Sequence, residues 1–147
     1  MRVAAIVGML AVGALAGRAE AACTISTTAV SFGTYNVFNA SATAANGTVT
    51  YHCGSADHNI VIDLSTGSGT YATRTLKKVA ENLNYNLYRD AAFATVWGDG
   101  SGTTGHYTIG NPPNNTDVNL TVYGRITALQ DVSAGAYSDT VVATINF

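Results

Sequence analysis

The sequence predicts an all-β protein built as an antiparallel β-sandwich. Two observations predict this class. Only 11% of the residues are charged, against about 25% in ordinary globular proteins, and short segments of alternating apolar residues recur between turn signals. The 147 residues are enough for one domain. A net charge of −2 without a basic stripe argues against nucleic acid as a partner.

The first 21 residues have the pattern of a secretory signal peptide. Arg2 supplies a short positive region, residues 3–16 form an apolar run, and Ala19-Glu20-Ala21 is an A-x-A cleavage site. The run is too short for the roughly 20 residues that span a bilayer, and no later segment could span one. We therefore expect residues 1–21 to be a signal peptide and residues 22–147 to be one exported domain without a membrane span.

Three strands are predicted in the first half of this domain. Residues 29–35 alternate apolar and polar side chains with a period of two. The dipeptide Asn46-Gly47 is a turn signal, and the same alternation returns after it in residues 48–53 and 59–65. Each segment has the pattern of a half-buried strand.

The second half contributes three more predicted strands, at residues 83–90, 118–126 and 139–147. Residues 97–105 are rich in glycine, and we expect them to form a hairpin connection. Only residues 74–81 could be helical, and the sequence leaves open whether they form a helical turn or a loop. About seven short strands separated by turns indicate a sandwich.

Cys23 and Cys53 are the only cysteines. An even count in an exported chain favours a disulfide over a metal site or a catalytic thiol. A bridge that closes a loop of about 30 residues would stabilise the fold by roughly 3.6 kcal/mol in the chain-entropy model.

The sequence offers little that would support catalysis. His52, His58 and His106 have no metal-ligand spacing. Ser101 lies in a glycine-rich loop that is neither a nucleophile elbow nor a phosphate-binding loop, and Asp99 alone is too little for calcium. We expect no enzyme activity, no catalytic residue, no cofactor and no metal.

The last predicted strand runs to Phe147 with one strongly apolar face. At the edge of a sheet, such a strand would expose backbone groups that pair with another strand. The sequence alone leaves open whether it is an edge or an ordinary closing strand.

Several segments together resemble the spore coat protein U domain, which is also the pilin domain of archaic chaperone–usher pili. The resemblance covers nearly the whole exported domain. Its segments are CTIS (23–26), VSFGTY (30–35), LNYNLYRDAAFATVWGDG (83–100), LTVYGRI (120–126) and AGAYSDTVVATINF (134–147).

The resemblance implies an incomplete immunoglobulin-like sandwich that lacks its last strand. Such subunits are completed by a periplasmic chaperone and then, at the outer-membrane usher, by the N-terminal strand of a neighbouring pilus subunit. Cys23 and Cys53 match the disulfide of the family. The implied groove for the chaperone or donor strand is walled by Val30, Phe32, Val141, Ala143, Ile145 and Phe147.

Polymerising subunits of the family carry an apolar donor segment before the first cysteine, whereas here the predicted signal ends almost at Cys23. We therefore expect a secreted subunit that accepts a strand without donating one, as a tip or minor subunit of a surface fibre. It would pass through the periplasm to the cell surface. The alternatives are a coat protein of a spore or cell surface that forms no fibre, and a secreted carbohydrate-binding module.

Overall fold

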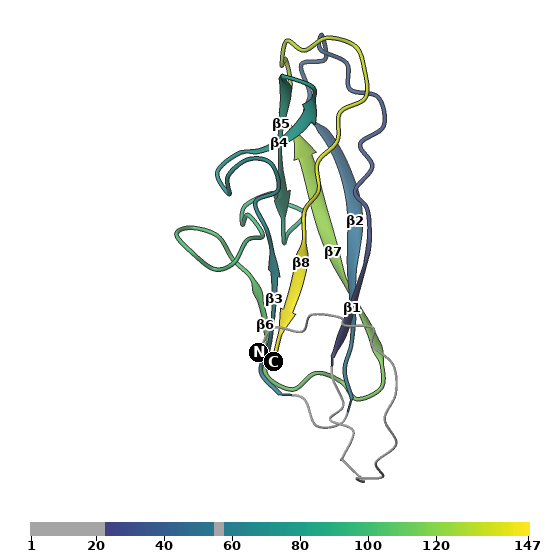
Figure 1. Cartoon of the computed structure of the whole chain (residues 1–147), viewed down its shortest axis with the longest axis vertical. Helices are drawn as coiled ribbons and strands as arrows, with labels where there is room; N and C mark the ends of the chain where they lie inside the picture. The colour runs from purple at the N-terminus through teal and green to yellow at the C-terminus, as the bar shows by residue number, and fades with distance from the viewer. Residues whose placement is uncertain (1–22, 55–57) are drawn as a thin grey trace, which may run out of the picture.

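The computed structural model describes residues 23–54 and 58–147, and these form two antiparallel sheets that pack against each other (Figure 1). All secondary structure within these residues is strand or turn, so none of it is a helix able to cross a membrane. The predicted signal peptide, residues 1–21, lies outside the described part of the chain.

The larger sheet has five strands in the order β1-β2-β7-β5-β4. Its strands pair antiparallel throughout. They are β1 (Thr24–Thr28), β2 (Thr43–His52), β7 (Asp117–Ile126), β5 (Glu81–Tyr88) and β4 (Arg74–Lys78).

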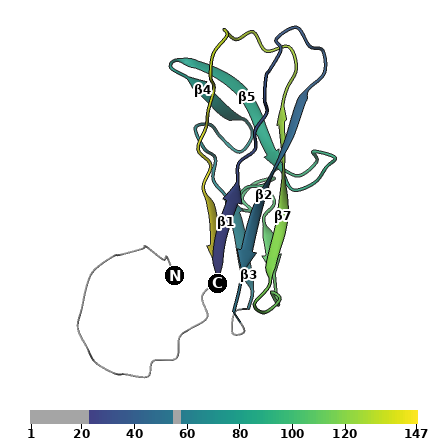
Figure 2. The same ribbon diagram turned by 90° about the vertical axis from the view of Figure 1, so that its right-hand side faces the viewer.

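The smaller sheet has three strands in the order β6-β3-β8. They are β6 (Tyr107–Ile109), β3 (Ile60–Leu64) and β8 (Ala143–Asn146). β1 is an edge of the larger sheet and β8 is an edge of the smaller one. Figure 2 shows these two edges next to each other at the end of the molecule where the chain terminates.

The expected all-β sandwich is confirmed, and four predicted strands lie where the alternation placed them. Residues 48–53, 59–65, 83–90 and 118–126 overlap β2, β3, β5 and β7. The last strand is shorter than expected, because regular pairing covers only Ala143–Asn146 of residues 139–147.

Two predictions for the first half of the chain are wrong. Residues 29–35 are not a strand, although Val30 and Phe32 are half-buried as the alternation suggested. The strand lies just before them, in β1. Asn46-Gly47 is not a turn but lies inside β2. Glycine is needed at position 47 because the backbone of Thr28 and the side chain of Val30 pass close to it. A Cβ there would lie 2.6 Å from the Thr28 carbonyl oxygen.

Residues 74–81 are neither a helical turn nor a loop. They form β4 and the start of β5, joined by a two-residue turn at Val79 and Ala80. Arg74 occupies an inward position of β4 and is fully buried. The alternation of apolar and polar residues that marks a strand was not visible in the sequence here, because this inward residue is charged.

Apolar side chains from the facing sides of the two sheets make the core. The larger sheet supplies alternate residues of β2, β5 and β7, and the smaller sheet supplies the three inward residues of β3. Trp97 fills the space between them, and its Nε1–H donates to the Ile62 carbonyl. The largest fully buried apolar side chains are Trp97, Ile60, Ile62, Ile126 and Val49.

The Arg74 guanidinium joins the two sheets from inside the core. It donates to the carbonyl oxygens of Ser65 (2.8 and 3.1 Å) and Trp97 (2.7 Å), and to the side-chain oxygen of Asn86 (2.7 Å). Burial lowers the pKa of this guanidinium. No carboxylate of the described residues contacts it, so neutral oxygens compensate its lost hydration.

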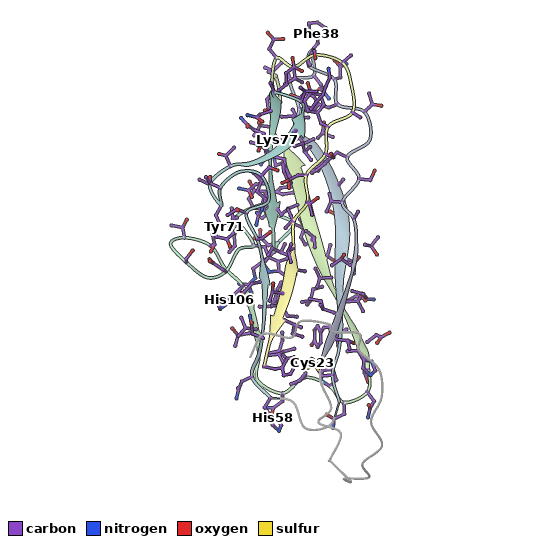
Figure 3. All side chains as sticks on the ribbon, viewed as in Figure 1. Cys23, Phe38, His58, Tyr71, Lys77 and His106 are labelled. Atoms are coloured by element: carbon purple, nitrogen blue, oxygen red, sulfur yellow. A yellow bond between two sulfur atoms is a disulfide. The ribbon has the colours of Figure 1, made fainter. Side chains whose placement is uncertain are left out.

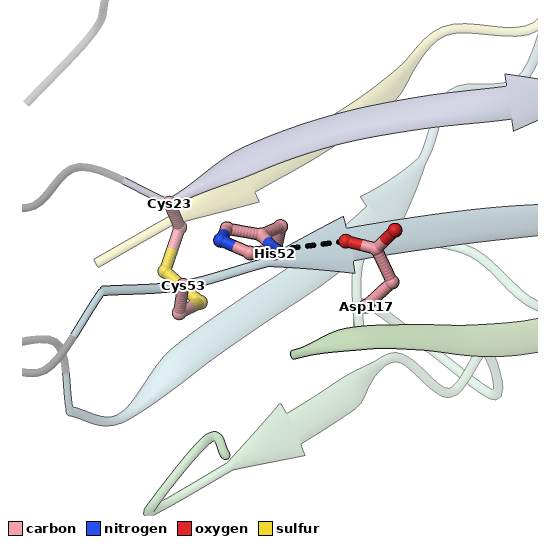
Figure 4. The surroundings of a disulfide bond; sticks show 4 residues. All are labelled: Cys23, His52, Cys53 and Asp117. Carbon is pink, nitrogen blue, oxygen red and sulfur yellow. Dashed lines mark hydrogen bonds and ion pairs between the residues drawn. A yellow bond between two sulfur atoms is a disulfide. The ribbon is translucent and has the colours of Figure 1, made fainter. Parts of the chain in front are cut away.

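The predicted disulfide between Cys23 and Cys53 is present and fastens the start of β1 to the residue after β2 (Figure 4). Cys53 is fully buried and Cys23 nearly so. Next to the bridge, His52 Nδ1 and a carboxylate oxygen of Asp117 lie 2.8 Å apart across β2 and β7. One end of the larger sheet is therefore held by a covalent bond and by a polar contact.

We expect Arg74→Met to lower the free energy of unfolding by about 3–5 kcal/mol, because it leaves the carbonyl oxygens of Ser65 and Trp97 without a donor. Lys77→Met is the matched control, since Lys77 is exposed on the same strand, and should change stability by less than about 0.5 kcal/mol. Urea denaturation of both variants, with the Cys23–Cys53 disulfide intact, measures the two effects. Equal losses would contradict the role given to Arg74.

Candidate functional site: an open groove between the sheets

A long apolar groove opens between the two sheets. It consists of two hollows with volumes of about 910 Å³ and 270 Å³. Residues 27–37 form one wall and residues 132–143 form the other. The hollows share Ala29, Val30, Phe32, Leu76 and Asp139, so they meet at that level. We call this feature the open groove.

The floor of the open groove is made of core residues of the larger sheet and one residue of β3. Under the larger hollow lie Leu76, Leu83 and Ile126, and under the smaller one lie Val49, Leu64, Tyr85, Leu87 and Val122. Only Leu76 is partly exposed, and the other floor residues have 1–6% of their surface exposed. The groove therefore lies directly above the hydrophobic core.

The central part of the first wall, residues 29–35, has no backbone partner. Within the described residues its backbone makes no hydrogen bond to another backbone group. It lies directly on the larger sheet because Gly124 has no side chain. A Cβ at Gly124 would lie 2.6 Å from Val30 Cγ1 and 2.8 Å from Phe32 Cζ. The Phe32 ring then packs edge-on against the Tyr85 ring at 5.8 Å.

The second wall, residues 132–143, is fastened at only a few points. Ser138 exchanges two backbone hydrogen bonds with Lys77 on β4 (2.8 and 3.1 Å), and the Ser65 amide donates to the Val142 carbonyl (2.9 Å). In the described structure, the backbone groups of residues 139–141 make no backbone–backbone bond. Apart from the Thr140 amide, which donates to the Asp139 carboxylate, residues 29–35 and 139–141 thus offer backbone groups without backbone partners, the condition that favours addition of a strand.

Asp139 lies where the two hollows meet and makes polar contacts there. Its carboxylate accepts hydrogen bonds from the Tyr85 hydroxyl (2.7 Å) and from the Ser68 amide (2.9 Å). Burial and this hydrogen bond raise the pKa of the Tyr85 phenol, so it stays a neutral donor. The contact holds the second wall against the larger sheet.

A second polar cluster holds the far end of the same wall to the β4–β5 hairpin. Lys78 Nζ donates to the Ser133 hydroxyl and to the Ala134 carbonyl, both at 2.6 Å. Glu81 accepts from the hydroxyls of Ser133 and Tyr137, and these bonds lower the pKa of the Glu81 carboxyl. Side-chain contacts therefore fix this end of the wall, in addition to the backbone bonds of Ser138 and Val142.

Of the six residues assigned to the groove from the sequence, Val30, Phe32, Val141 and Ala143 line it. Ile145 does not line it but packs half-buried against the core, and Phe147 is 45% exposed. Sequence reasoning missed Tyr85, Leu76 and Asp139. Tyr85 and Leu76 lie inward on β5 and β4, so a correct strand prediction for residues 74–81 would have indicated Leu76.

The histidines do not converge with other ligands. His52 pairs with Asp117, and His106 Nδ1 lies 3.0 Å from a carboxylate oxygen of Asp63. His58 is exposed and lies apart from His106 at one end of the sandwich (Figure 3). Within residues 23–54 and 58–147, no three His, Cys, Asp or Glu residues are grouped to hold a metal.

Comparisons with known proteins agree with the resemblance seen in the sequence. The family model described as the Spore Coat Protein U domain matches residues 10–144. "Protein U" of Myxococcus xanthus is 42% identical over 66 residues, which cover 44% of this chain and 34% of that protein. The chain thus spans about a third of the length of this relative.

A solved structure has the same fold. It is a chain of the CsuC–CsuE chaperone–tip adhesion subunit pre-assembly complex, from the archaic chaperone–usher Csu pili of Acinetobacter baumannii. The TM-score is 0.61 at 21% identity, over 86% of this chain and 40% of that one. This similarity confirms the immunoglobulin-like sandwich.

We expect Gly124→Ala to displace the first wall, because the new methyl group would overlap Val30 and Phe32. The free energy of unfolding should fall by about 1–3 kcal/mol, as for other overpacked sites. Gly110→Ala is the control, since its nearest neighbour would be Asn59 Oδ1 at 3.8 Å. Thermal denaturation of the two variants compares them, and an unchanged Gly124→Ala protein would mean that the wall does not rest on β7.

Proposed function

Because the chain belongs to the spore coat protein U domain family, we propose that it is a subunit of a surface fibre assembled by a chaperone and an usher. One observation carries this proposal. The open groove lies above core residues, between residues 29–35 and residues 139–141, and within the described part of the chain neither segment makes a backbone–backbone hydrogen bond. An added strand would pair with both segments and cover the core between them.

The chemistry of such an addition follows from the geometry of the groove. An extended peptide between residues 29–35 and 139–141 would pair its amides and carbonyls with the free groups of the walls. Its alternate side chains would point toward Leu76, Leu83 and Val122 on the floor. Backbone pairing would supply much of the affinity, and the fit of those side chains would supply selectivity.

We propose that a periplasmic chaperone provides this strand first and that a neighbouring pilus subunit replaces it at an outer-membrane usher. The family match and the fold shared with a chaperone–subunit complex support this order of partners. The protein would then be exported through the periplasm and would end at the cell surface.

A coat without fibres is the second candidate, and the description of the family as a spore coat domain favours it. The open groove would serve there as well, by accepting a strand from another coat component. A chaperone bound to the periplasmic protein favours the fibre, and a periplasmic protein free of chaperone favours the coat.

The proposed capture is tested with a matched pair of variants. Val141 lines the groove, whereas its neighbour Val142 is 56% exposed. Val141→Asp should reduce co-purification with the chaperone at least tenfold, because a carboxylate would be buried under the added strand. Val142→Asp should leave capture unchanged. Equal capture by both variants would show that the groove is not the docking edge.

We further propose that the protein occupies the tip or a minor position of the fibre. The predicted cleavage after Ala21 would leave little chain before Cys23 to act as a donor strand. The similar solved chain belongs to a complex described as holding a tip adhesion subunit, which supports the same position.

The mature N-terminus of the exported protein tests this position. N-terminal sequencing and intact mass should place it at Ala22, with one residue before Cys23. A mature protein with a dozen alternating apolar residues before Cys23 would contradict the tip position, while the Val141→Asp result would remain valid.

A further inference from the structure

The outer face of the larger sheet carries a cluster of aromatic rings around one guanidinium. Tyr123 and Arg125 point outward on β7, because they alternate with inward residues such as Val122. Tyr88 on β5 is paired with Tyr123 across the strands. The Phe93 ring lies 5.4 Å from that of Tyr88 at 82°, and the Arg125 guanidinium lies 5.3 Å from the Phe93 ring.

A tight loop after β5 holds Phe93 in this position, and Figure 2 shows this loop projecting beside β7. The Asp90 carboxylate accepts the amides of Ala94 (3.0 Å) and Thr95 (2.8 Å). These bonds lower the pKa of the Asp90 carboxyl, so it stays charged and keeps the loop closed. The ring is therefore presented by a fixed support.

Phe93 has a backbone φ of 55°. The left-handed region costs an aromatic L-residue about 1–2 kcal/mol, and glycine or asparagine would occupy it more easily. Its side chain is half-buried, and its ring packs edge-on against that of Tyr88. Backbone strain of this kind is concentrated at ligand-binding positions.

Arg125 is an exposed cation without a counter-charge. No carboxylate of the described residues lies within 4.0 Å of it, although the protein as a whole has a net charge of −2. The guanidinium carbon lies 5.3 Å from the centre of the Phe93 ring, in range of a cation–π contact. A planar guanidinium held in this way is suited to a bidentate pair with a carboxylate.

Apart from the Asp90 carboxylate, which the amides of its own loop hold, the side chains beside the cluster on β2 and β7 are polar and uncharged. Asn46 lies next to Tyr123 across the strands and is exposed, and the next row contains Thr48 opposite Thr121. These groups offer hydroxyls and amides but no further positive charge. The ligand that fits is thus rich in hydroxyl groups, with apolar ring faces and only occasional carboxylates.

We propose that this aromatic face (Tyr88, Phe93, Tyr123 and Arg125) binds a carboxylate-bearing glycan, whose sugar rings stack on the aromatic side chains and whose carboxylate pairs with Arg125. The aromatic face lies on the opposite side of the larger sheet from the open groove. Its occupation is therefore independent of strand addition, and the failure of either proposal leaves the other intact.

The probe is tetragalacturonate, compared with the same tetramer as its neutral methyl ester. The exported protein, with the chaperone if one co-purifies, is titrated by isothermal calorimetry. We expect the acidic tetramer to bind and the neutral ester to bind at least tenfold more weakly, because a charge-assisted pair contributes about 1.5–3 kcal/mol. Equal binding of both tetramers, or no binding of the acidic one, would overturn the proposal.

Two variants locate the site. Arg125→Gln should weaken binding of the acidic tetramer at least tenfold. Lys77→Gln removes the same charge from an exposed position on β4 and should not change binding. Phe93→Asn should also abolish binding, while the protein keeps or gains thermal stability because the strained φ is relieved. Equal losses of binding in Arg125→Gln and Lys77→Gln would show that only the net charge of the protein matters, and would refute the assigned site.

Discussion

The structure depends on the buried Arg74 guanidinium. A strand at the edge of one sheet places a cation in the core, where it binds the carbonyl of Ser65 after β3 and that of Trp97. Apolar contacts between sheets tolerate sliding, whereas hydrogen bonds to fixed carbonyls do not. Because burying the charge without these bonds would cost several kcal/mol, the two sheets have one relative position.

In this fixed position the two sheets do not close over the open groove. The sheets are tied together near β4, and the disulfide ties β1 to the residue after β2. In the described residues, no backbone hydrogen bond joins the wall at 29–35 to the wall at 132–143. The side chains of Asp139 and Lys78 and the backbone bonds of Ser138 and Val142 hold the second wall. These anchors keep the groove formed, while residues 29–35 and 139–141 make no backbone–backbone bond within the described structure.

The alternation of apolar residues predicted those strands whose inward residues are all apolar, such as β3 with Ile60, Ile62 and Leu64. It failed at β4, where an inward arginine interrupts the pattern. It also misplaced the first strand, because Val30 and Phe32 are half-buried by packing on glycines of β2 and β7 rather than by strand pairing. Both failures depend on contacts between distant segments, and these cannot be deduced from local periodicity. For the same reason, Asp139 and Tyr85 were not foreseen in the groove.

One strand, β7, links the two proposed sites. Its inward residues Val122 and Ile126 lie on the floor of the groove, and its outward residues Tyr123 and Arg125 belong to the aromatic face. Because side chains alternate with a period of two, a shift of one residue in register would exchange these faces. The ten paired positions between β2 and β7 oppose such a shift. A strand added on one side of this sheet would thus leave the opposite side free for a ligand.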